Sequence, residues 1–417
     1  MIPLEDVRAK VLGRVLRLDV IDVPIREALG LVLAEQVIAP DAVPPFPNTA
    51  MDGYAVRAAD TAGATEESPV RLRVVGDLPA GHAPTVAVGP GEAIRIMTGA
   101  PMPDGADAIV IVELTTRDDD GADGVNGGNG VFVQRESEPG RHVRAAGGDL
   151  RAGEIVFEPG TVLRPAHIGV LATVDAQTVR VYRPARVGVL STGDELVESG
   201  PLAPGKIRDS NRPMLLSLLA QAGADPVDLG SAKDDEELMT ATLDAAISEC
   251  DVVLTSGGVS VGDYDYVSAA LETIAAADPS GASIVEWYQV AIKPAKPLCI
   301  ATVRGTPVFG LPGNPVSSMV SFELFARPAL LAMMGHADPF RPEVIARVEG
   351  GLGRRPDGKV HFDRVRVRLD AGRYVVSGVR NQESNALASS AMAEGLAILP
   401  DGDGVPDGGD VTVMLIS

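Results

Sequence analysis

The sequence has few cysteines, and their placement points neither to disulfides nor to zinc. Cys250 and Cys299 are its only two, too few for a disulfide framework in a chain of 417 residues. Neither belongs to a Cys/His cluster with the spacing of zinc ligands. These absences fit a protein of the reducing cytoplasm.

Basic residues and export signals are also scarce. The 36 Lys and Arg residues face 57 Asp and Glu, a formal net charge of −21. Such a charge repels nucleic-acid backbones and anionic lipid surfaces, so we expect neither as a partner. Residues 1–6 include the acidic Glu5 and Asp6 where a signal peptide is basic, and no uncharged apolar run approaches about 18 residues. We therefore expect a soluble, cytoplasmic protein in which local basic groups bind any anionic ligand.

The length and patterning of the chain predict several domains. At about 150 residues per domain, 417 residues correspond to two to four domains. Helical spacing of apolar residues predicts helices over residues 4–18 and 25–33. Residues 39–48 are too rich in proline to be helical, and we place a domain boundary there.

Two of the predicted domains are built mainly from strands. The first extends over residues 54–143, where short β-rich runs occur at 70–75, 92–97, 108–114 and 130–133. Within it, the acidic and glycine-rich residues 118–130 predict a mobile hairpin loop without a chemical role. The second follows Pro339, where residues 360–369 alternate between aliphatic and charged side chains.

Between them, residues 185–330 alternate between strand and helix patterns. Apolar runs at 187–190, 252–254 and 307–311 alternate with amphipathic stretches at 214–222, 236–248 and 316–325. This order predicts a parallel sheet flanked by helices. Glycine-rich turns at 191–195 and 256–265 directly follow two of the strands, where open α/β sheets bind ligands. Taken alone, each turn is equally well explained as a plain connector.

Charged and polar residues near turns add weaker signals. Lys293 and Lys296 lie three residues apart on a proline-stiffened segment and could clamp one anion, or simply form a solvated turn. Asn314 followed by Pro315 predicts a helix start whose N–H groups face an anion, although a purely structural cap has the same sequence. Asp52 and Asp149 lie beside glycines, and the simplest interpretation is that each bonds its own turn. The residues alone thus predict an anion site near an α/β crevice.

Six motifs together give a more specific signal. In this order they resemble the molybdopterin molybdenumtransferase family (MoeA), whose members are similar to the E domains of gephyrin and of the plant Cnx protein. The resemblance covers nearly the whole chain. The motifs are residues 48–56, 95–101, 191–196, 209–212, 256–265 and 311–317.

The resemblance implies a reaction and partners. Adenylylated molybdopterin and molybdate would be converted to molybdenum cofactor, with release of AMP and a requirement for Mg²⁺. Metal-assisted cleavage would be coupled to metal insertion, without covalent catalysis. The family also implies a homodimer with its active site between subunits, and an upstream adenylyltransferase as a partner. A non-catalytic molybdopterin-binding or scaffold paralogue and a tungstate-preferring paralogue are the alternatives.

The resemblance further implies roles for individual residues. Mg²⁺ would be bound by carboxylates, with a threonine nearby, while two lysines would neutralise phosphate or molybdate. Two glycines would lie near the pterin phosphate, and an aspartate would accept from the aminopyrimidinone. In this sequence the metal ligands are Asp52, Asp149 and Glu195; Thr98, Lys293 and Lys296 complete the catalytic set; Gly257, Gly258 and Asp265 meet the pterin, Arg364 and Ser384 meet molybdate, and Asp209, Ser260, Asn314 and Ser317 make further substrate contacts.

The implied fold is multidomain α/β plus β, with a parallel-type sheet in the molybdopterin-binding domain. The expected boundaries are 1–45 and 144–180 for an elongated N-terminal domain, 46–143 for a small β domain, 181–335 for the α/β domain and 336–417 for a C-terminal β barrel. Three positions depart from the family pattern. Gln289 replaces a basic residue, Ala295 replaces a glycine between the lysines, and Gly148 replaces an acidic residue. If residue 295 needs a positive φ, its turn is strained or reshaped.

Overall fold

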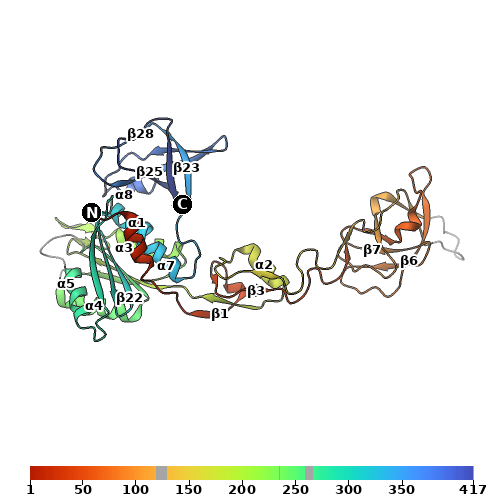
Figure 1. The fold of residues 1–417 in the computed structure, drawn as a ribbon, viewed down its shortest axis with the longest axis horizontal. Helices are drawn as coiled ribbons and strands as arrows, with labels where there is room; N and C mark the ends of the chain where they lie inside the picture. The colour runs from red at the N-terminus through yellow and green to blue at the C-terminus, as the bar shows by residue number, and fades with distance from the viewer. Residues whose placement is uncertain (119–128, 234, 259–265, 417) are drawn as a thin grey trace. The chain divides into compact units, whose positions relative to one another are not determined.

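A computed structural model describes residues 1–118, 129–233, 235–258 and 266–416 (Figure 1). The chain forms two compact units. The first comprises residues 1–34, 159–164 and 178–417, and the second comprises residues 35–158 and 165–177. Most of the expected loop at 118–130 lies outside the described residues.

The second unit contains a six-stranded sheet in the order β8-β5-β7-β6-β10-β9. Successive side chains of β5 are buried on opposite faces of the sheet. Tyr54 and Val56 belong to one apolar cluster, and Ala55 belongs to another. The expected strands are confirmed, except that residues 112–114 form a 3₁₀ turn. The strands are β5 (Gly53–Val56), β6 (Val70–Leu78), β7 (Glu92–Ile96), β8 (Ala108–Ile111), β9 (Thr115–Asp118) and β10 (Gly130–Val133).

Smaller elements complete this unit. Two short ladders pair segments that are distant in sequence, and one helix follows them. The proline-rich residues 39–48 are not helical, as expected. The elements are β3 (Val37–Ile38) with β12 (Ile155–Phe157), β4 (Asn48–Thr49) with β11 (Val143–Arg144), and α2 (Pro165–Thr173).

The first unit is organised around a six-stranded α/β sheet in the order β17-β14-β18-β22-β21-β19. Four strands are parallel as expected, but β21 runs antiparallel to both of its neighbours, β22 and β19, so the sheet is mixed. The reason is a two-residue hairpin: Arg304 and Gly305 both have positive φ and reverse the chain between β21 and β22. The strands are β14 (Arg186–Thr192), β17 (Asp225–Ala232), β18 (Val252–Ser256), β19 (Ile284–Gln289), β21 (Pro297–Val303) and β22 (Thr306–Leu311).

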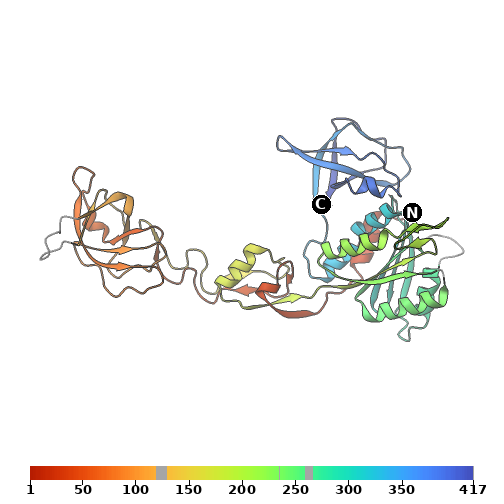
Figure 2. The same ribbon diagram turned by 180° about the vertical axis from the view of Figure 1, so that it is seen from behind.

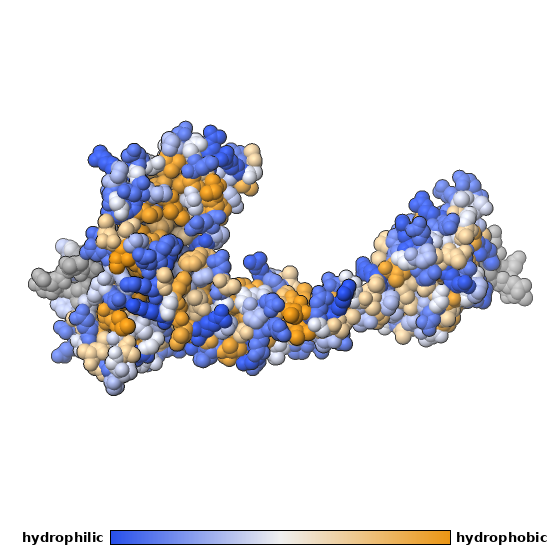
Figure 3. All heavy atoms as spheres, viewed as in Figure 1, coloured by the Kyte–Doolittle hydropathy of each residue, from blue (hydrophilic) through white to orange (hydrophobic). Residues whose placement is uncertain are grey.

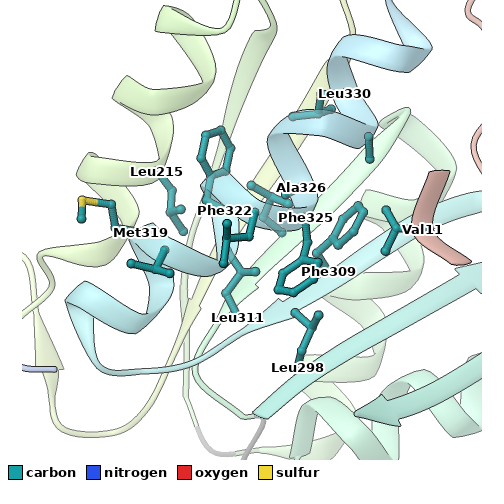
Figure 4. Close-up of a cluster of buried hydrophobic side chains, with 14 of the residues drawn as sticks. Val11, Leu215, Leu298, Phe309, Leu311, Met319, Phe322, Phe325, Ala326 and Leu330 are labelled. Atoms are coloured by element: carbon teal, nitrogen blue, oxygen red, sulfur yellow. The ribbon is translucent and has the colours of Figure 1, made fainter. Parts of the chain in front are cut away.

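Helices cover both faces of this sheet (Figures 1 and 2). On one face, side chains of the helices α1, α3, α6 and α7 pack with alternate strand residues such as Phe309 and Leu311 (Figure 4). On the other face α4 and α5 pack against the intervening residues, such as Val253 and Val308. The helices are α1 (Leu4–Leu12), α3 (Asn211–Gln221), α4 (Glu236–Glu249), α5 (Tyr266–Ala276), α6 (Pro315–Ser321) and α7 (Arg327–Met333).

The helix over Pro315–Met333 is long and apolar enough to cross a membrane by length and composition. It joins α6 to α7 through a π-helical turn, Phe322–Ala326. Its charged residues Glu323 and Arg327 interrupt the apolar run, and 89% of its most apolar window is buried inside the protein. It is therefore a core helix.

The C-terminal residues form a closed five-stranded barrel, as the resemblance implied. The order β25-β26-β23-β29-β27 is closed by pairing of β27 with β25. The barrel also joins the α/β region, because β20 (Ile292–Lys293) pairs with β25. The elements are β23 (Glu343–Glu349), β24 (Leu352–Gly353), β25 (Val360–Asp370), β26 (Arg373–Gly378), α8 (Leu387–Ser390), β27 (Gly395–Leu399), β28 (Gly404–Val405) and β29 (Asp410–Leu415).

The two N-terminal helix predictions need correction. The helix expected over 4–18 ends at Leu12, and Gly13 caps it. The helix expected over 25–33 is wrong: only the 3₁₀ turn Ile25–Glu27 forms. Gly30 then takes a φ of +83°, and β2 (Val32–Leu33) pairs with β13 (Thr178–Tyr182), which also pairs with β1 (Val20–Pro24). Pairing with a distant strand outweighs the local helical spacing.

The surface mixes polar and apolar side chains. Figure 3 shows hydrophilic and hydrophobic residues interspersed over the visible face of each unit. Many of the exposed charges are paired, such as Arg373 with Asp410 on the barrel. Exposed ion pairs of this kind contribute about 1 kcal/mol or less to stability.

Candidate functional site

The carboxyl ends of three parallel strands meet at one edge of the α/β sheet. The register pairs Ser191 with Ser256, and Ser256 with Leu311, so β14, β18 and β22 end side by side. From β14 the chain passes to β17 on one side, whereas from β18 it passes toward β19 on the other. The crevice between β14 and β18 is therefore the point where the strand order reverses, a common ligand site in α/β folds.

Glycines form the turns at this edge because the backbone demands them. Gly257 and Gly258 have φ of 99° and 67°. A Cβ on Gly257 would lie 2.7 Å from Thr192 Oγ1, so a side chain there would also collide with the end of β14. Gly193 has a φ of 136°, and a Cβ on it would collide with the Glu195 carboxylate. The sequence-predicted turns are therefore tightly packed, and the N–H groups of Gly257 and Gly193 donate to the carbonyls of Leu311 and Ala232, at 3.0 and 3.4 Å.

A first cavity of about 770 Å³ opens above these turns. Among the residues expected to act, it brings together Glu195, Asp209, Gly257, Gly258 and Asn314. Ser260 and Asp265 lie outside the described residues. The walls also include Asn211 and Tyr266, which sequence reasoning assigned no role. A cavity of this size is large enough for a bicyclic ligand with a phosphate.

A second cavity, of about 1110 Å³, shares three lining residues with the first, namely Pro297, Asn314 and Asn385. It lies within the first unit, between the segment that carries Lys293 and the start of the barrel. Its lining is rich in cations. These are Lys293, Lys296, Arg354, Arg355 and Lys359, with His361, Ser317 and Ser384 alongside.

The two lysines flank a strained residue. Ala295 is buried and has a φ of 74°, so the turn does adopt the left-handed conformation that its replacement of glycine put in question. Lys293 extends β20, and the Lys296 carbonyl accepts from Val290 N at 2.8 Å. Neither ammonium group has a carboxylate within ion-pair distance in the described part of the chain. Both are thus available to an anion in the second cavity.

The barrel side of this cavity is organised by Asp357. Its carboxylate accepts from Lys359 Nζ and Arg354 Nη2, both at 2.9 Å, and lies 3.2 Å from His361 Nε2. The bond from Lys359, followed by that from His361, lowers the pKa of Asp357 to about 2. The cations on this side therefore already have a counter-charge.

Arg364 is buried beneath the cavity and does not line it. Its Nη2 donates to the carbonyls of Asn381 and Glu383, at 2.9 and 3.2 Å. Burial lowers the pKa of Arg364. In this structure the guanidinium fixes the segment that carries Ser384, and the Ser384 side of that segment faces the cavity. The two residues expected to meet molybdate therefore have different surroundings.

The start of α6 differs in part from the expectation. Asn314 is the N-cap and Pro315 follows it, as expected, but the Asn314 side chain makes no capping hydrogen bond. The Val316 N–H expected to face a ligand instead donates to the Ser384 carbonyl at 3.0 Å. Ser317, nearly buried, lines the second cavity. This helix start therefore connects the α/β region to the barrel.

Asp209 bonds a neighbouring arginine. Its carboxylate oxygens accept from Arg212 N and Nε, at 3.2 and 3.1 Å, and Arg212 also pairs with Asp228 and Glu198. Burial acts to lower the pKa of Arg212, but the bonds to Asp228 and Asp209 raise it above its usual value. Asp209 thus helps to fix the first turn of α3 against the first cavity.

In the second unit, Asp52 does not bond its own turn, so that simplest interpretation was wrong. Its Oδ1 accepts from both the N–H and the Oγ1 of Thr98, each at 2.7 Å. The Thr98 hydroxyl and then the Thr98 N–H lower the pKa of Asp52, so its carboxylate stays charged. Asp149 is exposed, and its N–H donates to Val43 O at 2.9 Å.

The three expected metal ligands are divided between the units: Glu195 is in the first, and Asp52 and Asp149 are in the second. No cluster of three or more His, Cys, Asp or Glu residues suited to a metal ion occurs among the residues that the structure describes. Each carboxylate is nevertheless the hard oxygen donor that Mg²⁺ prefers.

Comparisons with known proteins match the chain along most of its length. The family described as the MoeA N-terminal region (domain I and II) matches residues 2–174. A probable molybdopterin binding domain matches residues 188–332, and the MoeA C-terminal region (domain IV) matches residues 354–416.

Relatives and solved structures agree with these matches. Molybdopterin molybdenumtransferase 2 of Mycobacterium tuberculosis is 43% identical over 383 residues, 91% of each chain. The Bacillus subtilis molybdopterin molybdenumtransferase is 35% identical, over 94% of this chain and 89% of its own. The crystal structure of a molybdopterin biosynthesis moeA protein from Pyrococcus horikoshii OT3 covers 100% of both chains with a TM-score of 0.82 and 30% identity.

Proposed function

The chain belongs to the molybdopterin molybdenumtransferase family, and from this premise we propose that it inserts molybdenum into molybdopterin during molybdenum cofactor biosynthesis. One observation of the structure carries the proposal. A glycine-lined cavity at the reversal point of the α/β sheet adjoins a cavity lined by Lys293 and Lys296, which have no ion-pair partner among the described residues. A pterin phosphate and an oxyanion would thus bind in neighbouring spaces.

We assign the first cavity to the pterin of adenylylated molybdopterin. The backbone of Gly257 and Gly258 would lie against its phosphate, with the Gly258 N–H as the proposed donor and Asp209 and Asn314 in the surrounding wall. Asp265, the proposed contact to the aminopyrimidinone, and Ser260, a further proposed substrate contact, lie outside the described residues.

We assign the second cavity to molybdate and the phosphoanhydride. Lys293 and Lys296 are compact point charges that suit a tetrahedral oxyanion, with Ser317 and Ser384 as neutral donors. Arg364 would act indirectly, because its bonds to the carbonyls of Asn381 and Glu383 position the segment that carries Ser384. Water would cleave the phosphoanhydride, which releases AMP and leaves the phosphate on molybdopterin, as molybdate is bound.

Mg²⁺ is the proposed cofactor, and the donor chemistry fits it. Asp52, Asp149 and Glu195 would be its ligands, and Thr98 holds the Asp52 carboxylate in its charged form. When bound, the ion would offset negative charge on the scissile phosphoanhydride. The residues themselves bind, orient and neutralise the substrates.

The assembly and setting are proposals of the same kind. We propose a homodimer in the cytoplasm that receives adenylylated molybdopterin from an upstream adenylyltransferase. The assay described next also distinguishes this function from the scaffold and tungstate-preferring alternatives.

The experiment mixes purified protein, Mg²⁺, molybdate and adenylylated molybdopterin, and measures AMP together with cofactor. Both products should appear, and Lys293→Ala should strongly reduce both. Lys10→Ala, an exposed lysine on α1, is the matched control. Neither product appearing would favour a scaffold role, whereas faster turnover with tungstate would favour the tungstate-preferring reading.

A further inference from the structure

Asn211 is a nearly buried polar residue that the proposed chemistry does not use. It is the first residue of α3, it is 8% exposed, and it lines the first cavity. Most asparagines are exposed, so a buried one needs hydrogen-bond partners that justify its burial.

Its side-chain amide joins two turns that are distant in sequence. Asn211 Nδ2 donates to Ser256 Oγ and to Gly313 O, both at 2.7 Å. Ser256 is the last residue of β18 and directly precedes the Gly257 turn, whereas Gly313 lies between β22 and α6. One nitrogen therefore satisfies two acceptors on different sides of the same cavity.

The two turns are also close to each other. The Gly257 N–H donates to Leu311 O at 3.0 Å, and a Cβ built on Gly313 would lie 3.7 Å from Gly257 Cα. That distance is an ordinary van der Waals contact, so the two turns lie side by side. Their spacing thus depends on the backbone contact and on the amide that spans both.

Asparagine suits this position chemically. An amide nitrogen carries two donor hydrogens and can serve two acceptors at once. An aspartate would instead place a carboxylate oxygen against the Gly313 carbonyl, which repels it. An alanine would leave the Gly313 carbonyl and Ser256 hydroxyl without this partner.

We propose that Asn211 is a positioning residue, which sets the spacing of the Gly257 and Gly313 turns and thereby shapes the cavity for the pterin phosphate. The ligand part of this inference rests on the proposed function. The spacing itself does not, because it can be measured without a ligand. Asn211 acts through the two turns, so its loss should weaken binding more than it slows the chemical step.

The test compares Asn211→Ala and Asn211→Asp with Ser217→Ala. Ser217 is an exposed residue of the same helix whose hydroxyl bonds only the Pro213 carbonyl in the described structure, at 2.8 Å. The first measurement is hydrogen exchange of the Gly257 amide without ligand. We then measure the affinity for molybdopterin and the steady-state kinetics with adenylylated molybdopterin.

Both Asn211 variants should raise the exchange rate of the Gly257 amide at least tenfold. We expect them to weaken molybdopterin binding and raise KM about tenfold, with kcat within threefold of the unsubstituted protein. Ser217→Ala should change none of these. Exchange and affinity within twofold of the original in folded variants would overturn the inference, as would a loss of kcat with an unchanged KM.

Ser256→Ala keeps the inference testable if the Asn211 variants do not fold. It removes one acceptor and leaves the bond to Gly313, so its effects should be smaller than those of Asn211→Ala. The double variant should be no worse than Asn211→Ala alone, and full additivity would contradict a shared role. If the original protein binds no molybdopterin, the proposed function fails, while the exchange measurement still decides the spacing.

Discussion

Ala295 has a backbone conformation that its side chain disfavours. Its φ of 74° is left-handed, and the residue is 3% exposed between the two lysines. A glycine there would lower the strain but would lose a buried methyl group and gain freedom in the unfolded chain. These effects oppose one another, which explains how alanine can occupy a position where the resemblance implies a glycine.

This balance predicts different outcomes for two substitutions. Ala295→Gly should change the free energy of unfolding by less than about 1 kcal/mol. Ala295→Val should cost about 2 kcal/mol or more, because a branched Cβ fits poorly at positive φ and the site is packed. Urea denaturation measures both, and Ala220→Val on the exposed side of α3 controls for the residue change. A valine cost equal to that control would show that the backbone is not strained.

Asp357 gives a pH dependence whose sign follows from its pKa. The pKa falls from 3.8 to about 2 in the folded protein, chiefly through the bond from Lys359. A depressed carboxyl pKa means that the stabilisation is complete above pH 3.8 and disappears as the pH falls through about 2. The ion pairs around Asp357 should therefore weaken on acidification.

Asp357→Asn should lower the urea midpoint at pH 5, and its difference from the original protein should shrink between pH 4 and pH 2. Because the asparagine cannot ionise, the variant lacks the stabilisation that the original protein loses when Asp357 is protonated. Glu343→Gln, an exposed acid of the same barrel, is the control. A difference that stays constant down to pH 2 would contradict the assigned pairing.

At the scale of elements, the π-helical turn between α6 and α7 carries a buried ion pair. Glu323 is 3% exposed, and its two oxygens accept from Arg341 Nε and Nη2, both at 3.0 Å. Arg327 Nε lies 3.8 Å from the same carboxylate, and burial lowers the pKa of Arg327. Because Arg341 lies two residues before the start of β23, this cluster fixes the start of the barrel to the core helix.

Glu323→Ala should destabilise the first unit by about 3–5 kcal/mol, because two largely buried guanidinium groups would lose their counter-charge. Thermal and chemical denaturation measure the loss. Glu272→Ala, an exposed position on α5, should change stability by less than about 0.5 kcal/mol. Similar costs for both variants would mean that the cluster contributes little.

At the scale of the whole molecule, the proposed catalytic residues belong to two compact units. Asp52, Thr98 and Asp149 are in one, whereas Glu195, Lys293 and Lys296 are in the other. The family resemblance implies that the active site of a dimer takes residues from both subunits. This proposal makes a prediction that needs no knowledge of the interface.

Asp52→Ala and Lys293→Ala should each be inactive alone and should complement when mixed. If a site takes Asp52 from one subunit and Lys293 from the other, a mixed dimer has one site with both lesions and one intact site. Activity per heterodimer should therefore return to about half of the unsubstituted level by two-fold symmetry. No recovery in dimers shown to be mixed would reject the shared site.

The sequence by itself determined the features that depend on near neighbours. Short apolar runs predicted the strands β14, β18 and β22, and alternation of aliphatic and charged residues predicted β25. Glycine turns marked the edge where the first cavity opens. The prolines at 39–48 excluded a helix, and the lysines at 293 and 296 marked the second cavity. These signals are local because side-chain periodicity and turn geometry are set within a few residues.

Only the tertiary structure decided which distant residues meet. It replaced the helix expected over 25–33 with a 3₁₀ turn and the two-residue strand β2, which pairs with β13. It also gave Asp52 a partner 46 residues away in Thr98. It also joined Asn211 to Gly313, 102 residues apart, which no motif indicated. The physical reason is that hydrogen bonds and burial stabilise contacts between residues that are distant in sequence. The spacing of neighbouring residues does not specify which distant residues will meet.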